Sequence, residues 1–400
     1  MTAVLRTSCG GCGSADLAEF LDLGRSPLAD RFPLPGEPDG PSIPLRVAVC
    51  QECWLAQLLD NPPDADLFGD DYGFMTGSSP ALAGYFARWA RWALAEYPGQ
   101  AEAGVIEIAC NDGTLLRHFA AAGVPALGIE PAGPPARAAV QAGLDVEQAP
   151  FTAALAGTTA RAGLVIACNV AAHVDDPRDF LEGIRALLRP GGVAIAEFQY
   201  LGDLIAGMQF DHVYHEHRYF YSLGSFARLA AGAGLRVTRV LRTPNQGGSL
   251  RVVLASEARP IGDAGGLVAL ESHLRSPGAY SSMQARADYS RGTLVAFLDA
   301  EMEDGRTVAG YGASAKSATL LNFCGLDRKT ISWVEDLTPG KIGRETPGTR
   351  IPIIAPADGM KPDTYLLLAW NYLSAVVRRE RDFLSSGGRL IVPGPIPLVI

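Results

Sequence analysis

Two separate segments of this 400-residue chain each combine a predicted strand, a glycine-containing turn and a helix, and this pairing constrains the fold most. The first segment runs over residues 107–114 and the second over 307–317. A turn of this kind is where a Rossmann-like sheet usually receives a nucleoside or nucleotide. We therefore predict an α/β protein with two Rossmann-like units.

Short apolar runs extend both units. In the first unit, helices at 115–122 and 180–188 separate strands, and a further helix at 79–95 precedes them because apolar residues recur there at helical spacing. Strands that alternate with helices of this length predict a parallel sheet. The predicted strands cover residues 105–108, 126–130, 164–168 and 193–197 in the first unit, and 331–336, 365–369 and 389–392 in the second.

Four of the seven cysteines form two C-x-x-C pairs, and these are Cys9, Cys12, Cys50 and Cys53. Two such pairs can supply the four thiolates of a closed, tetrahedral structural zinc site. The alternative is a set of unrelated thiols in a reducing compartment, where disulfides are not expected. We predict a zinc-binding module over residues 1–70.

The overall charge excludes one class of partner. The net charge of −9 and the pI near 5.3 argue against a nucleic-acid-binding protein. The beginning of the chain lacks the apolar stretch of a signal peptide, and no apolar run approaches the roughly 18 residues that a membrane span needs. We expect a cytoplasmic protein that has no membrane or nucleic-acid partner and is a monomer or a weak homo-oligomer.

The first turn reads E-x-A-x-N-x-G, and its departure from a glycine-rich sequence indicates its ligand. Ala109 and Asn111 occupy two positions where a dinucleotide site favours glycine, so that backbone amides can approach a pyrophosphate. S-adenosylmethionine has no phosphate and is therefore favoured as the cofactor. Glu130, at the end of the next strand, is placed to accept hydrogen bonds from two ribose hydroxyls. The predicted cofactor-binding residues are Glu107, Asn111, Asp112, Gly113, Glu130 and Asn169.

Three of the six histidines lie within one short stretch around Tyr214-His-Glu-His217. A metal site is one interpretation, although no carboxylate spacing matches a known helical pattern. Simple aromatic packing is a second. The third, which we favour, is catalytic: an imidazole is the natural base for a proton next to a carbonyl. His173 follows another strand and is expected at the carboxyl edge of the sheet, where ligands bind, although a hydrogen-bonded structural role is the alternative.

The second turn, Gly310–Ser317, nearly spells a phosphate-binding loop. Ala315 stands where that loop needs glycine, so ATP hydrolysis is a poor interpretation. The turn can still hold a diphosphate through its backbone amides, with Ser314 and Lys316 assisting.

Over its whole length the chain resembles the three-domain sugar C-methyltransferases of deoxysugar biosynthesis. The resemblance rests on the paired cysteines with the segment 21–30 between them, the turn at 107–113 and the motif at 214–217. It continues through Gly247-Gly248, the turn at 310–319 with Asn322-Phe323, and residues 347–352.

The resemblance implies a domain order, cofactors and a substrate. It implies a zinc-binding module (1–70), a class I methyltransferase domain (71–257) and a C-terminal α/β domain that holds the nucleotide sugar (258–400). The cofactors are expected to be S-adenosylmethionine and Zn²⁺, and the substrate a dTDP-linked 4-keto deoxysugar. A base would remove the proton at C-3, and the resulting enolate would attack the sulfonium methyl.

By resemblance His217 is the base, Glu216 orients it, Tyr214 lies near the keto oxygen, and His173 belongs to the active site. The expected substrate-binding residues are Phe74, Gln246, Gly312, Ser314, Lys316 and Asn322. Two of these depart from the family: Tyr72-Gly-Phe74 replaces Tyr-x-Tyr, and Gln246-Gly-Gly replaces His-Gly-Gly. The alternative function is therefore a homologue that methylates oxygen or nitrogen of another acceptor, or a non-catalytic binding module.

Overall fold

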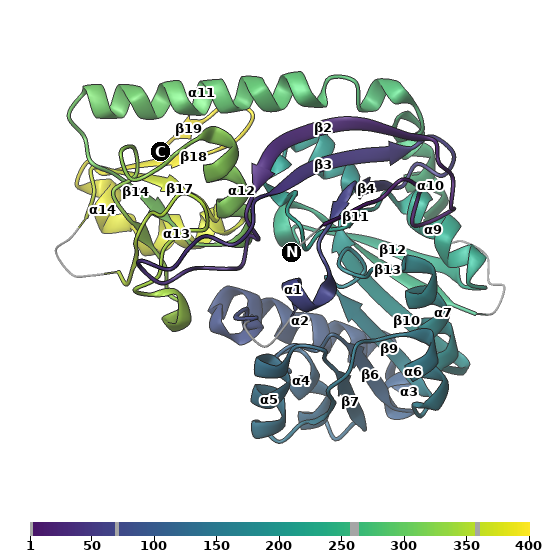
Figure 1. Ribbon diagram of the computed structural model, residues 1–400. Helices are drawn as coiled ribbons and strands as arrows, with labels where there is room; N and C mark the ends of the chain where they lie inside the picture. Colours follow the sequence, from purple (N-terminus) through teal and green to yellow (C-terminus); the bar gives the residue numbers. More distant parts are fainter. Residues whose placement is uncertain (1–2, 69–71, 257–263, 357–360) are drawn as a thin grey trace.

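A computed structural model describes residues 3–68, 72–256, 264–356 and 361–400 (Figure 1). The predicted domain boundaries at 70/71 and 257/258 lie outside these residues and stay predictions. None of the described helices is long and apolar enough to cross a lipid bilayer. The predicted fold class is confirmed, because two Rossmann-like sheets and a small cysteine-containing module are present.

A seven-stranded sheet lies at the centre of the chain and carries the first turn. Its order is β12 (Arg236–Thr243), β13 (Ser249–Ala255), β10 (Leu188–Gln199), β9 (Ala162–Cys168), β6 (Val105–Ile108), β7 (Ala126–Ile129) and β8 (Asp145–Glu147). The inner strands are buried on both faces, as continuous apolar runs predict. The four predicted strands pair in parallel, as expected, and the sheet continues at one edge with the unpredicted β13, which is antiparallel to both of its neighbours. Only the short turn at 244–248 joins β12 to β13, and so short a connection permits only a hairpin.

Alternate side chains of the central strands pack against helices on opposite faces. On one face Leu181 and Leu229 belong to the same core as Ile106 and Val165. On the other face Phe86 and Phe119 pack with Val105 and related residues. The helices concerned are α6 (Ala153–Thr158), α7 (Pro177–Leu187) and α9 (Leu223–Gly232) on the first face, and α2 (Pro80–Glu96), α3 (Pro98–Glu102) and α4 (Leu116–Ala121) on the second. Helix α5 (Gly133–Gln141) follows β7.

The N-terminal module contains a four-stranded sheet to which the central part of the chain contributes one strand. The strands are β2 (Leu17–Ser26), β3 (Ile43–Cys50), β4 (Ala56–Leu58) and β11 (Tyr219–Phe220), in the order β11-β4-β3-β2. Strands β1 (Val4–Leu5) and β5 (Asp60–Asn61) form a separate pair, and the short helix α1 (Asp64–Leu67) follows. Because β11 begins two residues after His217, this sheet anchors the histidine motif.

The C-terminal unit is a six-stranded sheet. Its order is β16 (Ile353–Ile354), β15 (Val334–Glu335), β14 (Val308–Tyr311), β17 (Thr364–Leu367), β18 (Arg389–Val392) and β19 (Leu398–Val399). All of its pairs are parallel except β18 with β19. Its helices are α12 (Ala315–Cys324), α13 (Leu373–Arg379) and α14 (Arg381–Ser385).

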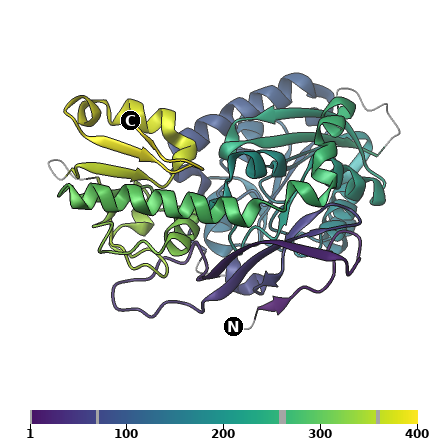
Figure 2. The same cartoon turned by 90° about the horizontal axis from the view of Figure 1, so that it is seen from above.

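One long helix connects these parts. Helix α11 (Met283–Glu303) runs along one side of the molecule from strands β2 and β3 to the C-terminal sheet (Figures 1 and 2). Its buried Leu294 and Leu298 belong to a core that also contains Leu21 of β2, Leu204 of α8 (Leu201–Gly207) and Leu320 of α12. Helix α10 (Ala264–Leu270) lies closer to α9 and β12. The zinc module, the central unit and the C-terminal unit therefore share side-chain packing.

Candidate active site

The four cysteines of the two C-x-x-C pairs converge. Their Sγ atoms all lie within 4.8 Å of one another. The Sγ atoms of Cys9 and Cys53 are 3.5 Å apart, and those of Cys12 and Cys50 are 3.6 Å apart. A tetrahedral zinc ion with bonds of about 2.3 Å separates its sulfur ligands by about 3.8 Å. The residues therefore fit a zinc ion, which is a cofactor of this chain.

The chemistry of the thiols also suits a cation. The hydrogen bond between the Cys53 and Cys9 sulfurs lowers the pKa of Cys9 below its usual range, although burial opposes the shift. The amide of Gly11 donates to the same sulfur over 3.3 Å. Cys9, Cys50 and Cys53 are buried in the core that underlies helix α9, so the ion would support the packing of this module. Four thiolates leave no open position for chemistry.

The turn after β6 adopts the backbone of a glycine-rich loop although it contains one glycine. Ala109 and Asn111 both have φ of 52°, and Gly113 has φ of 72°. Residues with a Cβ atom adopt this left-handed region at a cost of roughly 1–2 kcal/mol each. With alanine at 109 and asparagine at 111, the loop therefore keeps the path of a glycine-rich loop but has side chains at these two positions.

Two buried acids face the space above this turn. Glu130 accepts hydrogen bonds from the amides of Asn111 and Ala132, at 2.8 and 2.9 Å. Within the described chain, Oε2 of Glu107 is buried and has no hydrogen-bond partner. Burial, and secondarily the charge of Glu130, raises the pKa of Glu107 well above its usual range. An unpartnered buried carboxylate oxygen fits a ligand that brings a positive charge and donors, as S-adenosylmethionine does.

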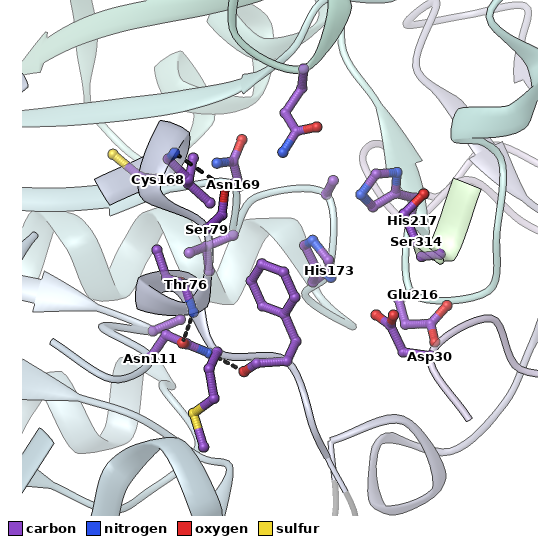
Figure 3. Close-up of a pocket in the computed structure, with 18 of the residues that line it drawn as sticks. Asp30, Thr76, Ser79, Asn111, Cys168, Asn169, His173, Glu216, His217 and Ser314 are labelled. Atoms are coloured by element: carbon purple, nitrogen blue, oxygen red, sulfur yellow. Dashed lines mark hydrogen bonds between the residues drawn. The ribbon is translucent and has the colours of Figure 1, made fainter. Parts of the chain in front are cut away.

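Asn111 and Asp112 hold residues 74–77 over the turn, and we call these four residues the cover. Oδ1 of Asn111 accepts from the amide of Thr76 over 2.8 Å, while its Nδ2 donates to the carbonyl of Phe74 over 3.0 Å (Figure 3). Oδ2 of Asp112 accepts from the amide of Gly77 over 2.8 Å. Asp112 and Gly113 do not line the cavity described below. Of these predicted cofactor residues, Asp112 therefore holds the cover and Gly113 provides the turn.

The histidine motif fixes the tautomer of one imidazole. Nδ1 of His217 lies 2.8 Å from the carbonyl oxygen of His212 and must donate to it. Nε2 is then the unprotonated nitrogen, and it accepts the hydroxyl of Tyr214 over 2.7 Å. Burial, with the neighbouring His173 and Lys316, lowers the pKa of His217 well below its usual range. The imidazole is therefore neutral at neutral pH, with an acceptor nitrogen that can take a proton.

The expected role of Glu216 needs correction. We expected its carboxylate to orient His217, but the Nδ1 of His217 pairs with the backbone carbonyl of His212. Oε2 of Glu216 is buried and has no partner among the described residues. Figure 3 shows the Glu216 carboxyl beside that of Asp30, away from the His217 ring. Sequence proximity misled the expectation, because residues 214–217 form a turn in which the amide of His217 donates to the carbonyl of Tyr214 over 2.9 Å, and Glu216 and His217 have different hydrogen-bonding surroundings.

His173 lies where the strand order predicts, beside His217. Their ring centroids are 4.9 Å apart with the rings at 84°. Burial, and secondarily Arg218, lowers the pKa of His173 to about 4. Its Nδ1 is buried without a hydrogen-bond partner in the described chain, so a purely structural, hydrogen-bonded role does not account for it.

The C-terminal turn carries a cation beside two acids, Glu335 and Asp336, and Oδ2 of Asp336 accepts from the amide of Ala313 over 2.7 Å. Gly312 has φ of 91°, and a Cβ atom there would lie 2.7 Å from that of Ala369. Ser314 caps α12, and Lys316 follows in the first turn of that helix. Lys316 is 6% exposed, and burial lowers its pKa to about 8. Lys341 lies nearby and donates to the carbonyl of Ala313 over 2.6 Å.

The remaining predicted residues divide into two groups. Phe74 and Gln246 line the cavity, and Oε1 of Gln246 lies 3.4 Å from Nζ of Lys316. Asn322 does not line it, and its expected role in substrate binding is revised. Its Nδ2 donates to the carbonyls of Ala318 and Pro347, at 2.7 and 3.0 Å, so Asn322 fastens a loop of the C-terminal unit.

One cavity of about 1220 Å³ joins the two turns. Its lining includes Glu107 and Glu130 at one turn, His173 and His217, and Lys316 at the other turn. Figure 3 shows Asn111 and Asn169 on one side of it, His173 in the middle, and His217 with Ser314 on the other side. A single ligand pocket usually measures roughly 300–1,000 Å³, so this volume suits two ligands together.

The sequence reasoning missed several lining residues. They are Asp30, Phe68, Tyr72, His212, Glu335, Lys341 and Arg379. Glu335 was discoverable, because it ends β15 as an acid just as Glu130 follows β7. Asp30 ends the segment 21–30 that carries part of the resemblance, but no role was assigned to it, since only tertiary packing brings the N-terminal module to the cavity.

Comparisons with known proteins agree across the chain. Three family models match it: "Putative zinc binding domain" over residues 9–68, "Methyltransferase domain" over 83–240 and "C-methyltransferase C-terminal domain" over 244–397. The C-methyltransferase NovU of Streptomyces niveus is 35% identical over 407 residues, which cover 98% of this chain and 96% of that protein.

Two solved structures are also similar over part of the chain. Magnesium protoporphyrin IX methyltransferase of Synechocystis PCC 6803, with bound SAH, has a TM-score of 0.37 and 15% identity, covering 44% of this chain and 83% of that one. The CcbJ methyltransferase of Streptomyces caelestis has a TM-score of 0.38 and 15% identity, covering 48% and 98%.

Proposed function

The chain belongs to the three-domain, S-adenosylmethionine-dependent sugar C-methyltransferase family, and on this premise we propose that it methylates C-3, next to the 4-keto group of a dTDP-linked deoxysugar. The observation that carries the proposal is the single cavity that joins an acid-lined turn, a neutral imidazole and a lysine-bearing turn. The relative NovU is a C-methyltransferase, which supports carbon as the acceptor.

In this proposal the two turns bind different ligands. Glu107 and Glu130 bind S-adenosylmethionine, which when bound supplies an electrophilic methyl group on a positively charged sulfur. Lys316 and Ser314, at the N-terminus of α12, bind the diphosphate of the nucleotide sugar. The sugar then lies at the histidines, between the two turns.

His217 acts as the base. Its Nδ1–H stays on the carbonyl of His212, and its Nε2 removes the proton at C-3, which the adjacent ketone acidifies. When the sugar binds, the hydroxyl of Tyr214, 2.7 Å from Nε2 in the free site, turns to the keto oxygen; this frees the Nε2 lone pair for the C-3 proton, and the hydroxyl donates to the oxygen as negative charge develops there. The negative charge on the enolate oxygen stabilises the positive charge that His217 gains when it takes the proton. Without the enolate, the buried site disfavours that positive charge.

The proposal is tested with S-adenosylmethionine and a dTDP-4-keto-6-deoxyhexose. We expect a product whose NMR spectrum contains a new methyl group on C-3, the ring carbon next to C-4 on the side of C-2. With S-adenosylhomocysteine in D₂O, the wild type should exchange the C-3 proton for deuterium. A methoxy product, or transfer without exchange, would mean an oxygen acceptor; a methyl group on C-5 would move the reaction to the other carbon next to the ketone.

His217→Asn provides the matching variant. Turnover and C-3 exchange should fall together by roughly 10²–10⁴-fold, the usual contribution of a positioned base, while ligand binding stays nearly unchanged. His273→Asn is the control, because His273 is exposed and its Nδ1 also pairs with a backbone carbonyl, that of Leu270, over 3.0 Å. If His217→Asn behaves as His273→Asn does, another group is the base.

A further inference from the structure

Two carboxyl groups from distant parts of the chain meet in the cavity. Asp30 follows β2 in the N-terminal module, and Glu216 belongs to the histidine motif. Figure 3 shows their carboxyl groups side by side, and both residues line the cavity. The reaction as proposed above assigns no step to either group.

The pair cannot hold two negative charges easily. Burial, and secondarily the neighbouring Asp30, raises the pKa of Glu216 to about 8. Burial also raises the pKa of Asp30, against the opposing effect of Lys341 and Lys316. The other titratable and charged groups that face the pair are Tyr72, Tyr214 and Arg218. Glu216 is buried and Asp30 is half-buried; two adjacent carboxyl groups in such surroundings titrate together, so at neutral pH the pair retains one proton.

Unpartnered buried atoms in the same cavity point to a ligand. Glu216 is 3% exposed, and its Oε2 has no hydrogen-bond partner in the described chain. His212 is 1% exposed and lines the same cavity, and its Nε2 likewise has no partner there. Buried polar atoms are nearly always hydrogen-bonded, so these two atoms mark places for polar groups of a ligand.

We propose that Asp30 and Glu216 share one proton, and that Glu216, as the protonated member, donates a hydrogen bond to the keto oxygen of the sugar. Asp30 is a positioning residue, because its negative charge keeps the proton on Glu216. This inference rests on the proposed function, which makes a keto sugar the occupant. No covalent step is added: His217 takes the C-3 proton, and the hydrogen bonds from Glu216 and Tyr214 strengthen as charge develops on the oxygen.

The proposal also gives the zinc module a part in the active site. Its sheet contains β11 directly after the histidine motif and presents Asp30 after β2. The ion would therefore support one member of the carboxyl pair from a distance, without contacting the substrate.

The test is the pH dependence of turnover in four variants, measured with a dTDP-4-keto-6-deoxyhexose. In the wild type, turnover should fall as pH rises through the deprotonation of the pair. Asp30→Asn removes the like charge, so Glu216 loses its proton at lower pH and the decline should shift down by about 1 pH unit or more. Asp16→Asn, in an exposed part of the same module, is the control and should leave the profile unchanged.

Two substitutions of Glu216 separate donation from structure. Glu216→Gln keeps a neutral donor, so kcat at saturating sugar should stay within about tenfold of the wild type and should lack the decline at high pH, whereas KM still rises above pH 8 as Lys316 loses its charge. Glu216→Ala removes the donor and should lose roughly 10²–10³-fold. If Glu216→Gln is as inactive as Glu216→Ala, or if Asp30→Asn leaves the decline in place, the proposal is wrong.

A measurement without substrate distinguishes this proposal from the proposed function. Infrared spectra of the free protein should contain a protonated-carboxyl band that Glu216→Gln removes and that disappears at lower pH in Asp30→Asn. Failure of the wild type to methylate the sugar would overturn the proposed function while leaving this titration intact. Absence of the band near neutral pH would overturn the shared proton whatever the substrate.

Discussion

The two strand–turn–helix units of this protein both carry an acid at the end of the second strand, Glu130 and Glu335, but they differ in the charge that the turn itself leads into. The turn after β6 has three residues with positive φ and faces Glu107 and Glu130. The turn after β14 has positive φ only at Gly312 and leads into Lys316. Both turns lie at the carboxyl ends of parallel strands, where such folds bind ligands. The fold therefore sets where a ligand lies, and a few side chains set whether it is a cation or an anion.

The largest effect should come from neutralising the cationic turn. Lys316→Met removes the charge but keeps the packing of the stem. Because hydrogen bonds to charged groups contribute about 1.5–3 kcal/mol, the Kd for dTDP should rise roughly 10- to 150-fold. Calorimetry with dTDP measures this, and affinity for S-adenosylmethionine should not change. Lys329→Met, at an exposed position outside the cavity, is the control; equal loss for both ligands would contradict the division between the turns.

Removing Glu130 at the acidic turn should have a smaller effect, and it should weaken the binding of S-adenosylmethionine rather than that of dTDP. Glu130→Ala removes two ribose contacts of about 1 kcal/mol each, so the Kd for S-adenosylmethionine should rise roughly 30-fold. Glu147→Ala, on the exposed neighbouring strand β8, is the matched control. Calorimetry with both ligands tests the comparison, and unchanged binding of S-adenosylmethionine would remove Glu130 from the cofactor site.

The two turns should also respond oppositely to pH. Burial lowers the pKa of Lys316 to about 8, so Lys316 is charged below that pH and neutral above it. Affinity for dTDP should therefore fall by up to about tenfold per pH unit above 8. Burial raises the pKa of Glu107, so affinity for the S-adenosylmethionine cation should fall as pH is lowered and this carboxylate takes up a proton. Parallel slopes for the two ligands would contradict the assignment.

The smallest effects should come from substitutions that change the backbone strain of each turn, and they are measured as changes in the free energy of unfolding. Ala109→Gly relieves a left-handed alanine, worth about 1–2 kcal/mol, but adds an entropic cost of about 0.5–1 kcal/mol, so the free energy of unfolding should rise by up to about 1.5 kcal/mol. Gly312→Ala should lower it by about 1–3 kcal/mol, because φ is 91° and the new Cβ would meet Ala369. Urea unfolding measures both, and destabilisation by Ala109→Gly would show that Ala109 makes compensating contacts.

Local sequence patterns predicted the elements that carry the site. The strands at 105–108, 126–130 and 164–168 are present because continuous apolar runs form strands buried on both faces. The antiparallel strand β13 was not predicted, because an apolar run indicates a buried strand but does not indicate whether that strand is parallel or antiparallel to its neighbour. The partner that orients His217 was also mispredicted. Its Nδ1 pairs with a backbone carbonyl, and because every residue has a carbonyl, the sequence does not indicate which one is the partner.

The sequence by itself determined the four cysteines that converge, the two turns and the position of the histidine motif, because each depends on residues close together in the chain or on paired motifs of fixed spacing. Only the tertiary structure decided which groups face one another across the cavity. Asp30 beside Glu216, Gln246 beside Lys316 and Trp370 donating to Asp211 over 2.5 Å all join residues from different parts of the chain. Such contacts follow from how sheets and helices pack, and packing depends on the summed burial of many side chains rather than on any one motif.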